Sequence, residues 1–372
     1  MPNFDIVRQA NPKKTFRVAS VMGTYDLQSS SVQEHFVGDI ALPDEWSVGL
    51  IVGNSGTGKT TIAKELFPDA YITQFDYTHE SILDDMPQGR SVDDIVKTLS
   101  SVGFASPPSW LKPYAVLSNG EKMRCDLARA ILSDKDLFVF DEFTSVVDRT
   151  VAKIGSFAMQ KAIRRQPGKQ MIAVTCHFDV EDWLLPDWVF NTNDMTFHLC
   201  SETQKKNRPP IELRIYEVKH DKDAAWRMFA KYHYLSHSHN NAAHVYVCTA
   251  NGELAAFCSV LPFPHAHLKN VRREHRTVVL PDFQGAGIGT AFSDAIAQMY
   301  TDAGYTYIST TSNPAFVHAR AKSPKWIVTR LPGRTPIGAG KFQNASTIGG
   351  NVSSNRITSS FKYIGQNGKS KT

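Results

Sequence analysis

The stretch GNSGTGKTT, residues 53–61, has the composition and spacing of a loop that binds phosphate groups. It fits the pattern G-x-x-x-x-G-K-[ST] and lies between an apolar run and a helix-forming stretch. Its glycines let backbone N–H groups curl around phosphate oxygens, Lys59 can reach the β- and γ-phosphates, and Thr60 can ligate Mg²⁺. The candidate nucleotide-binding residues are Gly53, Asn54, Ser55, Gly56, Thr57, Gly58, Lys59, Thr60 and Thr61. A Gly-rich turn without a ligand is the alternative interpretation.

A second motif, LFVFDEFTSVVD at residues 137–148, supplies two carboxylates at the end of an apolar run. Four apolar residues in a row are typical of a buried parallel strand, and ligands of open α/β sheets bind beyond the carboxyl ends of the strands. We therefore expect Asp141 to hold Mg²⁺ through water and Glu142 to polarise the attacking water. Ordinary surface acids are the alternative.

These motifs, the segment LSNGE at 117–121 and a later histidine occur in the order found in ATP-binding cassette (ABC) ATPases, and the chain resembles that family over about residues 20–200. The resemblance implies that His177 is the switch histidine and that Gln74 senses the metal and the water. It also implies that the helix starting at LSNGE caps the γ-phosphate held by a second subunit, so that ATP joins a homodimer. The residues assigned to nucleotide in this way are Ser118, Gly120 and Glu121. Asn119 departs from the family's usual glycine.

A third segment, RTVVLPDFQGAGIGTAFSDAI at residues 276–296, places a glycine-rich loop between a β-branched strand and a helix. Small residues let backbone N–H groups approach a pyrophosphate, and the helix dipole adds to the attraction. The loop candidates are Gln284, Gly285, Ala286, Gly287, Ile288 and Gly289. A bare G-x-G-x-x-G is a weak signal, and a dinucleotide-binding fold is the rival interpretation.

The same segment, with TTSNPAFVHARAKSPKW downstream, resembles the acetyl-CoA loop of GNAT acyltransferases, and the resemblance covers about residues 211–332. It implies that Val279 and Leu280 pair with the pantetheine arm of acyl-CoA and that Asn313 contacts the same arm. Many members carry a tyrosine seven residues after that asparagine, which protonates the departing thiolate. Here the position is occupied by Arg320.

The general acid and the general base of acyl transfer are therefore open. His318 and Tyr307 are nearby alternatives to the missing tyrosine. Seven histidines lie between residues 233 and 275, and a neutral imidazole can accept a proton from an amine. Tyr234 and His237 lie in the segment that approaches the acceptor pocket in this family. One alternative is that these histidines have a structural or surface role. Another is that they form a zinc site.

Strand-like runs alternate with helical stretches on both sides of a polar segment that ends in two prolines. The expected fold is α/β, with four parts. These are a P-loop ABC-type ATPase domain at 1–200, a linker at 201–210, a GNAT-like acyl-CoA-binding domain at 211–335 and a basic Gly/Ser/Asn-rich tail at 336–372. The strands expected in the second domain are 211–218, 244–248, 254–260, 276–280 and 305–309, and the helices are 221–232, 289–303 and 314–321.

The net charge of +5 is distributed unevenly. Residues 303–372 contain ten Lys and Arg and no Asp or Glu, so they carry +10, which leaves −5 for residues 1–302. A one-sided basic end favours a polyanionic partner such as a nucleic acid; a solvated tail with contacts to the anionic cofactor is the alternative. The five cysteines form no C-x-x-C pair, and no apolar run approaches the ~18 residues of a membrane span. A cytoplasmic protein without membrane contact is expected.

Together these patterns predict an enzyme that hydrolyses ATP and transfers an acyl group from acetyl-CoA or another acyl-CoA to an amine. The expected acceptor is a nucleic acid, DNA or RNA. Residues 231–290 also resemble, faintly, the phage Mom-type enzymes that modify DNA bases. Transfer to a small amine or a protein lysine is one alternative, and an ATP-gated nucleic-acid-binding protein with an inactive GNAT fold is another.

Overall fold

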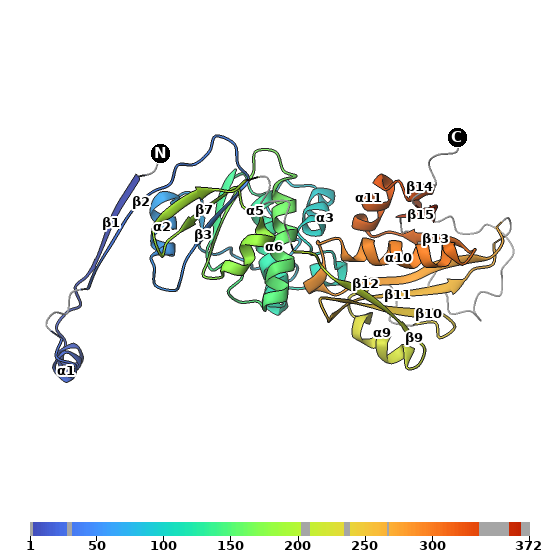
Figure 1. Cartoon of the computed structure of the whole chain (residues 1–372), viewed down its shortest axis with the longest axis horizontal. Coiled ribbons are helices and arrows are strands. Elements are labelled where there is room, and N and C mark those ends of the chain that lie inside the picture. The colour runs from blue at the N-terminus through green and yellow to red at the C-terminus, as the bar shows by residue number, and fades with distance from the viewer. Residues whose placement is uncertain are drawn as a thin grey trace. The chain divides into compact units, whose positions relative to one another are not determined.

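The computed structural model describes residues 3–27, 32–201, 209–233, 239–265, 268–334 and 357–365. The chain divides into two units, and Figure 1 labels the helices and strands that form them. Unit 1 contains residues 1–75, 135–146 and 163–208, and unit 2 contains residues 76–134, 147–162 and 209–372. The division differs from the expected boundary near residue 200, because two helical segments from the first half of the chain group with the second half.

Unit 1 is built on a six-stranded sheet with the order β4-β5-β6-β3-β7-β8. The strands are β3 (Val48–Val52), β4 (Tyr71–Ile72), β5 (Leu137–Phe140), β6 (Gln170–Thr175), β7 (Trp188–Asn191) and β8 (Thr196–Leu199). The first five in this order are parallel, and β8 returns antiparallel to β7. The apolar sequence of β3 explains why every residue of this strand is buried.

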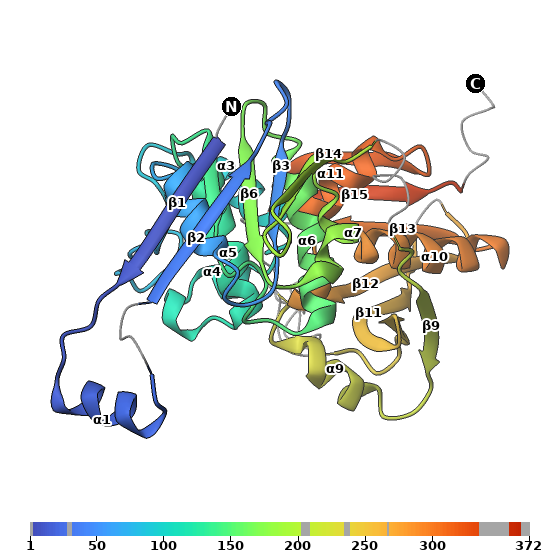
Figure 2. The same ribbon diagram turned by 60° about the vertical axis from the view of Figure 1, so that its left-hand side comes forward.

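Among the described residues of unit 1, α2 (Lys59–Leu66) follows β3, and the short α7 (Glu181–Leu184) precedes β7. The chain begins with an antiparallel pair, β1 (Asn3–Ala10) and β2 (Val32–Asp39). Between them lies α1 (Phe16–Thr24), which has no buried residue. Figure 2 shows α1 at the far end of this pair, away from the sheet.

Unit 2 opens with a helical segment that packs around buried side chains such as Phe104, Trp110 and Leu127. Its helices are α3 (Val92–Ser101), α4 (Pro107–Trp110), α5 (Asn119–Leu132) and α6 (Arg149–Ile163), the last of which ends at the boundary with unit 1. Helix α5 begins with a complete capping box, in which Ser118 and Glu121 satisfy each other's backbone N–H groups. The LSNGE segment therefore starts a helix, as expected.

The rest of unit 2 is a seven-stranded sheet with the order β14-β15-β13-β12-β11-β10-β9. The strands are β9 (Leu213–Val218), β10 (His244–Ala250), β11 (Glu253–Pro262), β12 (Val271–Val279), β13 (Thr306–Thr311), β14 (Trp326–Arg334) and β15 (Ile357–Tyr363). Among these described strands, β12 and β13 are the only parallel neighbours.

Three helices cover this sheet: α9 (Lys222–Ala230), α10 (Ile288–Asp302) and α11 (Pro314–Lys322). Alternate residues of β11 face opposite ways, since Phe257 packs with α9 and Cys258 with α10. The two helices therefore lie on opposite faces. Among the described helices none is long and apolar enough to cross a membrane.

Strand β15 corrects the tail expected at 336–372. Residues 357–363 pair with both β13 and β14, and Phe361 and Tyr363 are buried in the core. The Gly/Ser/Asn-rich composition around it hides this strand, because only three of its seven residues are apolar: Ile357, Phe361 and Tyr363. The domain sheet therefore ends within the segment that the sequence assigns to a tail.

Candidate functional site

The loop at 284–289 joins β12 to α10 and provides an open helix N-terminus. Helix α10 begins after Gly287, whose φ is +90°, a left-handed conformation that favours glycine. A Cβ atom on Gly287 would meet nothing within 4 Å. Backbone N–H groups at such a helix start attract phosphate oxygens, so the geometry fits the pyrophosphate of acyl-CoA.

The other side of this loop is packed against the helical segment of unit 2. A Cβ atom on Gly285 would lie 2.5 Å from the Cβ of Ala158 and 2.9 Å from the Cα of Gly103. The Gln284 side chain accepts a hydrogen bond from the Ala105 N–H at 2.7 Å. Gln284 and Gly285 therefore hold the loop in place, whereas Gly287 leaves it open.

The ladder between β12 and β13 ends early. Their parallel pairing covers only Val271 to Glu274, although β12 continues to Val279, which pairs with β11 on its other edge. Val279 and Leu280, which the resemblance assigns to the pantetheine arm, therefore lie at the end of β12 and just beyond it, past the residues that pair with β13. Asn313 caps α11 with its side-chain oxygen, so its amide nitrogen is the part that would contact the pantetheine arm.

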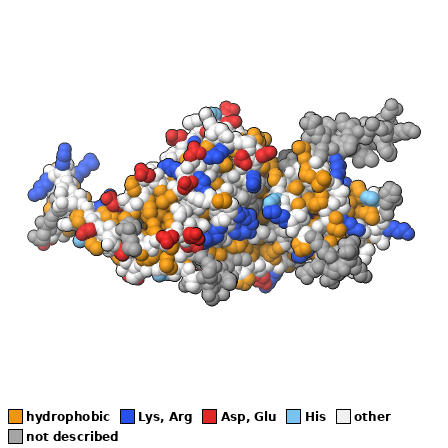
Figure 3. All heavy atoms as spheres, turned by 90° about the horizontal axis from the view of Figure 1, so that it is seen from above, with side chains coloured by type: hydrophobic (Ala, Val, Ile, Leu, Met, Phe, Trp, Pro, Cys, Tyr) orange, Lys and Arg blue, Asp and Glu red, His pale blue; other side chains and the backbone are white. Residues whose placement is uncertain are grey.

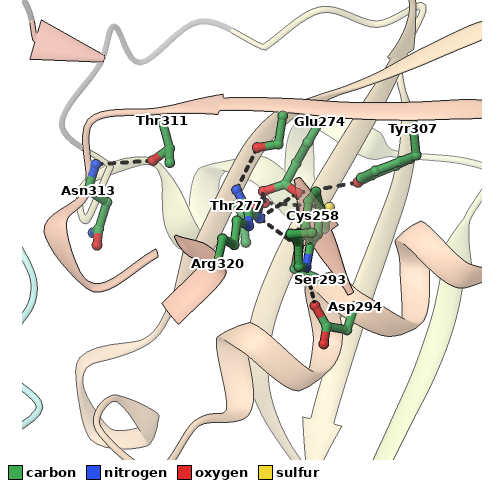
Figure 4. Close-up of polar contacts among 11 residues, drawn as sticks. Cys258, Glu274, Thr277, Ser293, Asp294, Tyr307, Thr311, Asn313 and Arg320 are labelled. Carbon is green, nitrogen blue, oxygen red and sulfur yellow. Dashed lines mark hydrogen bonds and ion pairs between the residues drawn. The ribbon is translucent and has the colours of Figure 1, made fainter. Parts of the chain in front are cut away.

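Arg320 lies buried where β12 and β13 separate (Figure 4). Its Nη2 donates to both carboxylate oxygens of Glu274, at 2.9 and 2.8 Å, and to Ser293 Oγ at 2.7 Å. Its Nη1 donates to Ser309 Oγ at 2.6 Å. Burial opposes the charge on Glu274, but the Arg320 guanidinium and hydrogen bonds, including one from Thr277, hold the pKa of this carboxyl below its usual value.

The candidates for proton transfer lie in different surroundings. Tyr307 is fully buried, and burial raises the pKa of its hydroxyl well above the usual value. His318 is exposed on α11. Tyr234 and His237 lie outside the described residues. His239, which the sequence does not distinguish from its neighbours, is buried beside Trp226, and burial lowers its pKa.

In unit 1 the loop at 53–58 and the start of α2 hold the residues that the sequence assigns to a nucleotide. Gly56 has a φ of +85° and open space where a Cβ would stand, and Gly58 starts α2 in the left-handed conformation. Lys59 Nζ donates to the Asn54 carbonyl oxygen at 2.6 Å, across the loop. Thr60 Oγ1 donates to Asp141 Oδ2 at 2.7 Å, so the two expected Mg²⁺ ligands lie together.

The other candidates in unit 1 follow the ends of neighbouring parallel strands. Glu142 follows β5 with a φ of +52°, and His177 follows β6, with its Nδ1 3.5 Å from Thr144 Oγ1. Gln74 follows β4 and is exposed. Tyr71, which the sequence does not single out, donates a hydrogen bond to Asp141, and burial raises the pKa of its hydroxyl.

The start of α5, assigned to nucleotide by resemblance, lies in unit 2. Ser118 is exposed, but both oxygens of Glu121 accept hydrogen bonds, from Ser118 N at 3.0 Å and from Ser109 Oγ at 2.9 Å. Glu121 therefore caps the N-terminus of α5. A Cβ atom on Gly120 would lie 3.0 Å from the carboxylate of Asp282.

Arg124, one turn along α5, is fully buried against the segment that precedes the 284–289 loop. Its Nη2 donates to the Asp282 carbonyl oxygen at 3.2 Å, and its Nη1 lies 4.0 Å from the Asp282 carboxylate. Burial lowers the pKa of Arg124, and the nearby carboxylates of Asp282 and Glu121 oppose that change. Helix α5 is thus joined by direct contacts to the segment just before the 284–289 loop.

Residues 210–321 match the acetyltransferase (GNAT) family. This range includes the loop, the separating strands and Arg320. The chain therefore contains a GNAT acetyltransferase domain, and an acyltransferase function is supported for it.

Two curated proteins match part of the chain. One is the mRNA export factor elf1 of Schizosaccharomyces pombe, 31% identical over 121 residues, and the other is elongation factor 3B of Saccharomyces cerevisiae, 33% identical over 116 residues. Each match covers 26% of this chain and 11% of the relative, so the chain spans about a tenth of their length. Among solved structures, the ribosomal-protein-S18-alanine N-acetyltransferase of Escherichia coli is 16% identical with a TM-score of 0.30, over 42% of this chain and 98% of that one.

Proposed function

We propose that the GNAT domain transfers an acyl group from acetyl-CoA or another acyl-CoA to an amine. The observation that carries this proposal is the combination of an open helix start at Gly287 with strands that separate beyond Glu274. The first feature suits the pyrophosphate and the second suits the extended pantetheine arm. Acyl-CoA supplies an activated thioester.

In the proposed reaction the amine nitrogen bonds to the thioester carbonyl carbon, and the C–S bond breaks with its electron pair on sulfur. The nitrogen gives up a proton to water or to a neutral imidazole. Arg320 is not the acid that protonates the thiolate, because a guanidinium keeps its protons under these conditions. Its hydrogen bonds instead hold α11 against β12 and β13, next to the place proposed for the thioester.

Acetyl-CoA binding and transfer test this function. We expect Gly287→Ala to weaken acetyl-CoA binding at least tenfold, because the methyl group fills the cradle. Gly304→Ala, at the other end of α10, is the matched control: Gly304 also has positive φ and open space, so it brings the same backbone strain. Equal affinities for the two variants in calorimetry, or no acetyl-CoA binding by the wild type, would contradict the proposal and favour an inactive fold.

We also propose that unit 1 binds ATP with Mg²⁺ and hydrolyses it. The supporting geometry is the cradle at Gly56, Lys59 across the loop, and the adjacent oxygens of Thr60 and Asp141. Lys59→Ala should abolish ATP binding but leave acetyl-CoA binding unchanged, whereas Lys64→Ala on the exposed side of α2 should leave both unchanged. Retained ATP binding by Lys59→Ala would remove this part of the proposal.

We propose a nucleic acid as the amine-bearing acceptor. The basic end of the chain supports this, although Arg320 and Lys325 are paired with Glu274 and Asp294 inside the fold. Exposed Lys13, Lys14 and Arg17 add a second basic region at α1, visible at the left end of Figure 3. Labelled acetyl-CoA should transfer label to DNA or RNA. If the label is found only in small amines or in lysine peptides, the acceptor is that kind of amine and not a nucleic acid.

A further inference from the structure

We infer that unit 1 carries a zinc site formed by Glu181, His198 and Cys200, separate from the proposed nucleotide and acyl-CoA sites. Each residue offers one ligand atom, and these atoms lie within 4.8 Å of one another. The set combines a carboxylate oxygen, an imidazole nitrogen and a thiol sulfur. None of the three belongs to the motifs that define the proposed function.

The backbone places two of these ligands on one face of a strand. Strand β8 pairs with β7 in the register Val189↔His198, and the Cys200 N–H donates to the Asp187 carbonyl oxygen at 2.9 Å, which extends the ladder by one residue. Side chains two positions apart in an extended strand point to the same side of the sheet. His198 and Cys200 therefore face the same way.

The third ligand comes from the helix that leads into the same hairpin. Glu181 is the first residue of α7, and α7 precedes β7 by only three residues. All three ligands therefore belong to residues 181–200 within unit 1. The proposed site needs neither a second copy of the chain nor the other unit.

The donor chemistry favours Zn²⁺. Zinc binds thiolate at about 2.3 Å, imidazole nitrogen at 2.0–2.1 Å and carboxylate oxygen at 2.0–2.2 Å in a tetrahedral arrangement, so its ligand atoms stand roughly 3.3–3.6 Å apart. A small side-chain adjustment closes the present cluster to that spacing. Mg²⁺ and Ca²⁺ prefer sets made of oxygen alone, so a thiol and an imidazole select against them.

The degree of exposure fits an ion that enters from solvent. His198 is exposed, and Glu181 and Cys200 are partly buried, so a water molecule can complete the fourth position. A bound ion would tie the start of α7 to the outer strand of the sheet, β8. The site would therefore stabilise this edge of unit 1.

Zinc titration of the full chain, purified in the presence of a chelator and then dialysed free of it, tests the inference. We expect one equivalent of Zn²⁺ to bind in calorimetry in the presence of excess Mg²⁺, and to raise the melting temperature. Cys200→Ser and His198→Asn should each lower the affinity at least tenfold. His198 is exposed, so its variant should still fold.

Cys176→Ser is the matched control, because Cys176 is also a partly buried cysteine of unit 1 and lies outside the cluster. It should bind zinc like the wild type. With Co²⁺ as the probe, a thiolate-to-metal charge-transfer absorption should appear in the wild type and in Cys176→Ser but not in Cys200→Ser. Absence of stoichiometric zinc binding, or binding that survives both ligand substitutions, would overturn the inference. Neither result bears on acyl transfer.

Discussion

Arg320 stands where the resemblance to GNAT enzymes leads one to expect a tyrosine that donates a proton. The side chain is instead buried and bonded to Glu274, Ser293 and Ser309. A buried charge is stable only when paired and hydrogen-bonded, and each guanidinium nitrogen named here has such a partner. The replacement therefore turns a chemical position into a structural one that joins β12, β13, α10 and α11.

Removal of the Arg320 charge should destabilise the protein strongly. Arg320→Met leaves Glu274 buried without its cation, which costs about 3–5 kcal/mol in the free energy of unfolding. Lys322→Met, on the exposed side of the same helix, should change this free energy by less than about 0.5 kcal/mol. Urea denaturation measures both, and equal losses would show that the buried pair is not the cause.

The histidines of unit 2 should make stability depend on pH. Burial, together with the positive charges of Arg276 and Arg273, lowers the pKa of His275 to about 3. The folded state therefore keeps His275 neutral, while the unfolded state takes up a proton below its ordinary pKa of about 6.5. The stability contribution is complete above that pH and is lost as the pH falls from about 6.5 toward 3, by about 1.4 kcal/mol per pH unit for one proton.

His275→Gln removes this proton uptake, so its free energy of unfolding should fall less than that of the wild type between pH 7 and pH 5. Substitution of the more exposed His244 should leave the wild-type dependence in place. Chemical denaturation at the two pH values measures the difference. Parallel losses in the wild type and in His275→Gln would contradict the assignment to this residue.

At the scale of elements, the two faces of the loop between β12 and α10 differ in how well they tolerate an added methyl group. Both Gly285 and Gly287 have positive φ, so alanine strains either backbone by about 1–2 kcal/mol. Only at Gly285 would the new methyl group also collide with Ala158 and Gly103. We expect Gly285→Ala to be less stable than Gly287→Ala by a further 1–3 kcal/mol or so, in thermal unfolding. Equal melting temperatures would mean that the helical segment does not press on this loop.

The parts of the fold and site that the sequence predicts well are local. Both phosphate-type loops lie within a single strand–loop–helix unit, and the glycines that they need are adjacent in the chain. The strand Val48–Val52 and the helix that continues to Leu132 occur as expected. Local spacing alone is enough to define such units.

The parts that the sequence misses depend on distant residues. Strand β15 joins the sheet 46 residues after β13 ends, and Glu274 is 46 residues from Arg320. The contact between Tyr71 and Asp141 spans 70 residues. The pairing of such groups is decided by the tertiary fold, which no local spacing encodes.

At the scale of the whole molecule, nucleotide should control association. If α5 caps a phosphate held by a second copy, Glu142→Gln should slow hydrolysis and accumulate an ATP-dependent dimer. Asp282 lies beside Gly120 at that helix start, where its negative charge would repel the incoming phosphate. Combining Asp282→Asn with Glu142→Gln should therefore lower the ATP concentration needed for dimerisation. Sedimentation velocity measures the fraction of dimer for the single and the double variant, and a monomer at saturating ATP would argue against this mode of association.

The contact between Arg124 and Asp282 also has a consequence for biosynthesis. The two residues are 158 positions apart, so during synthesis the Arg124 guanidinium is exposed long before Asp282 and the residues around it have been made. The early helices of unit 2 cannot reach their final packing until the acyltransferase sequence has emerged. A fragment cut near residue 200 would keep Arg124, Gly103 and Ala158 at a bare surface, and should be prone to aggregation.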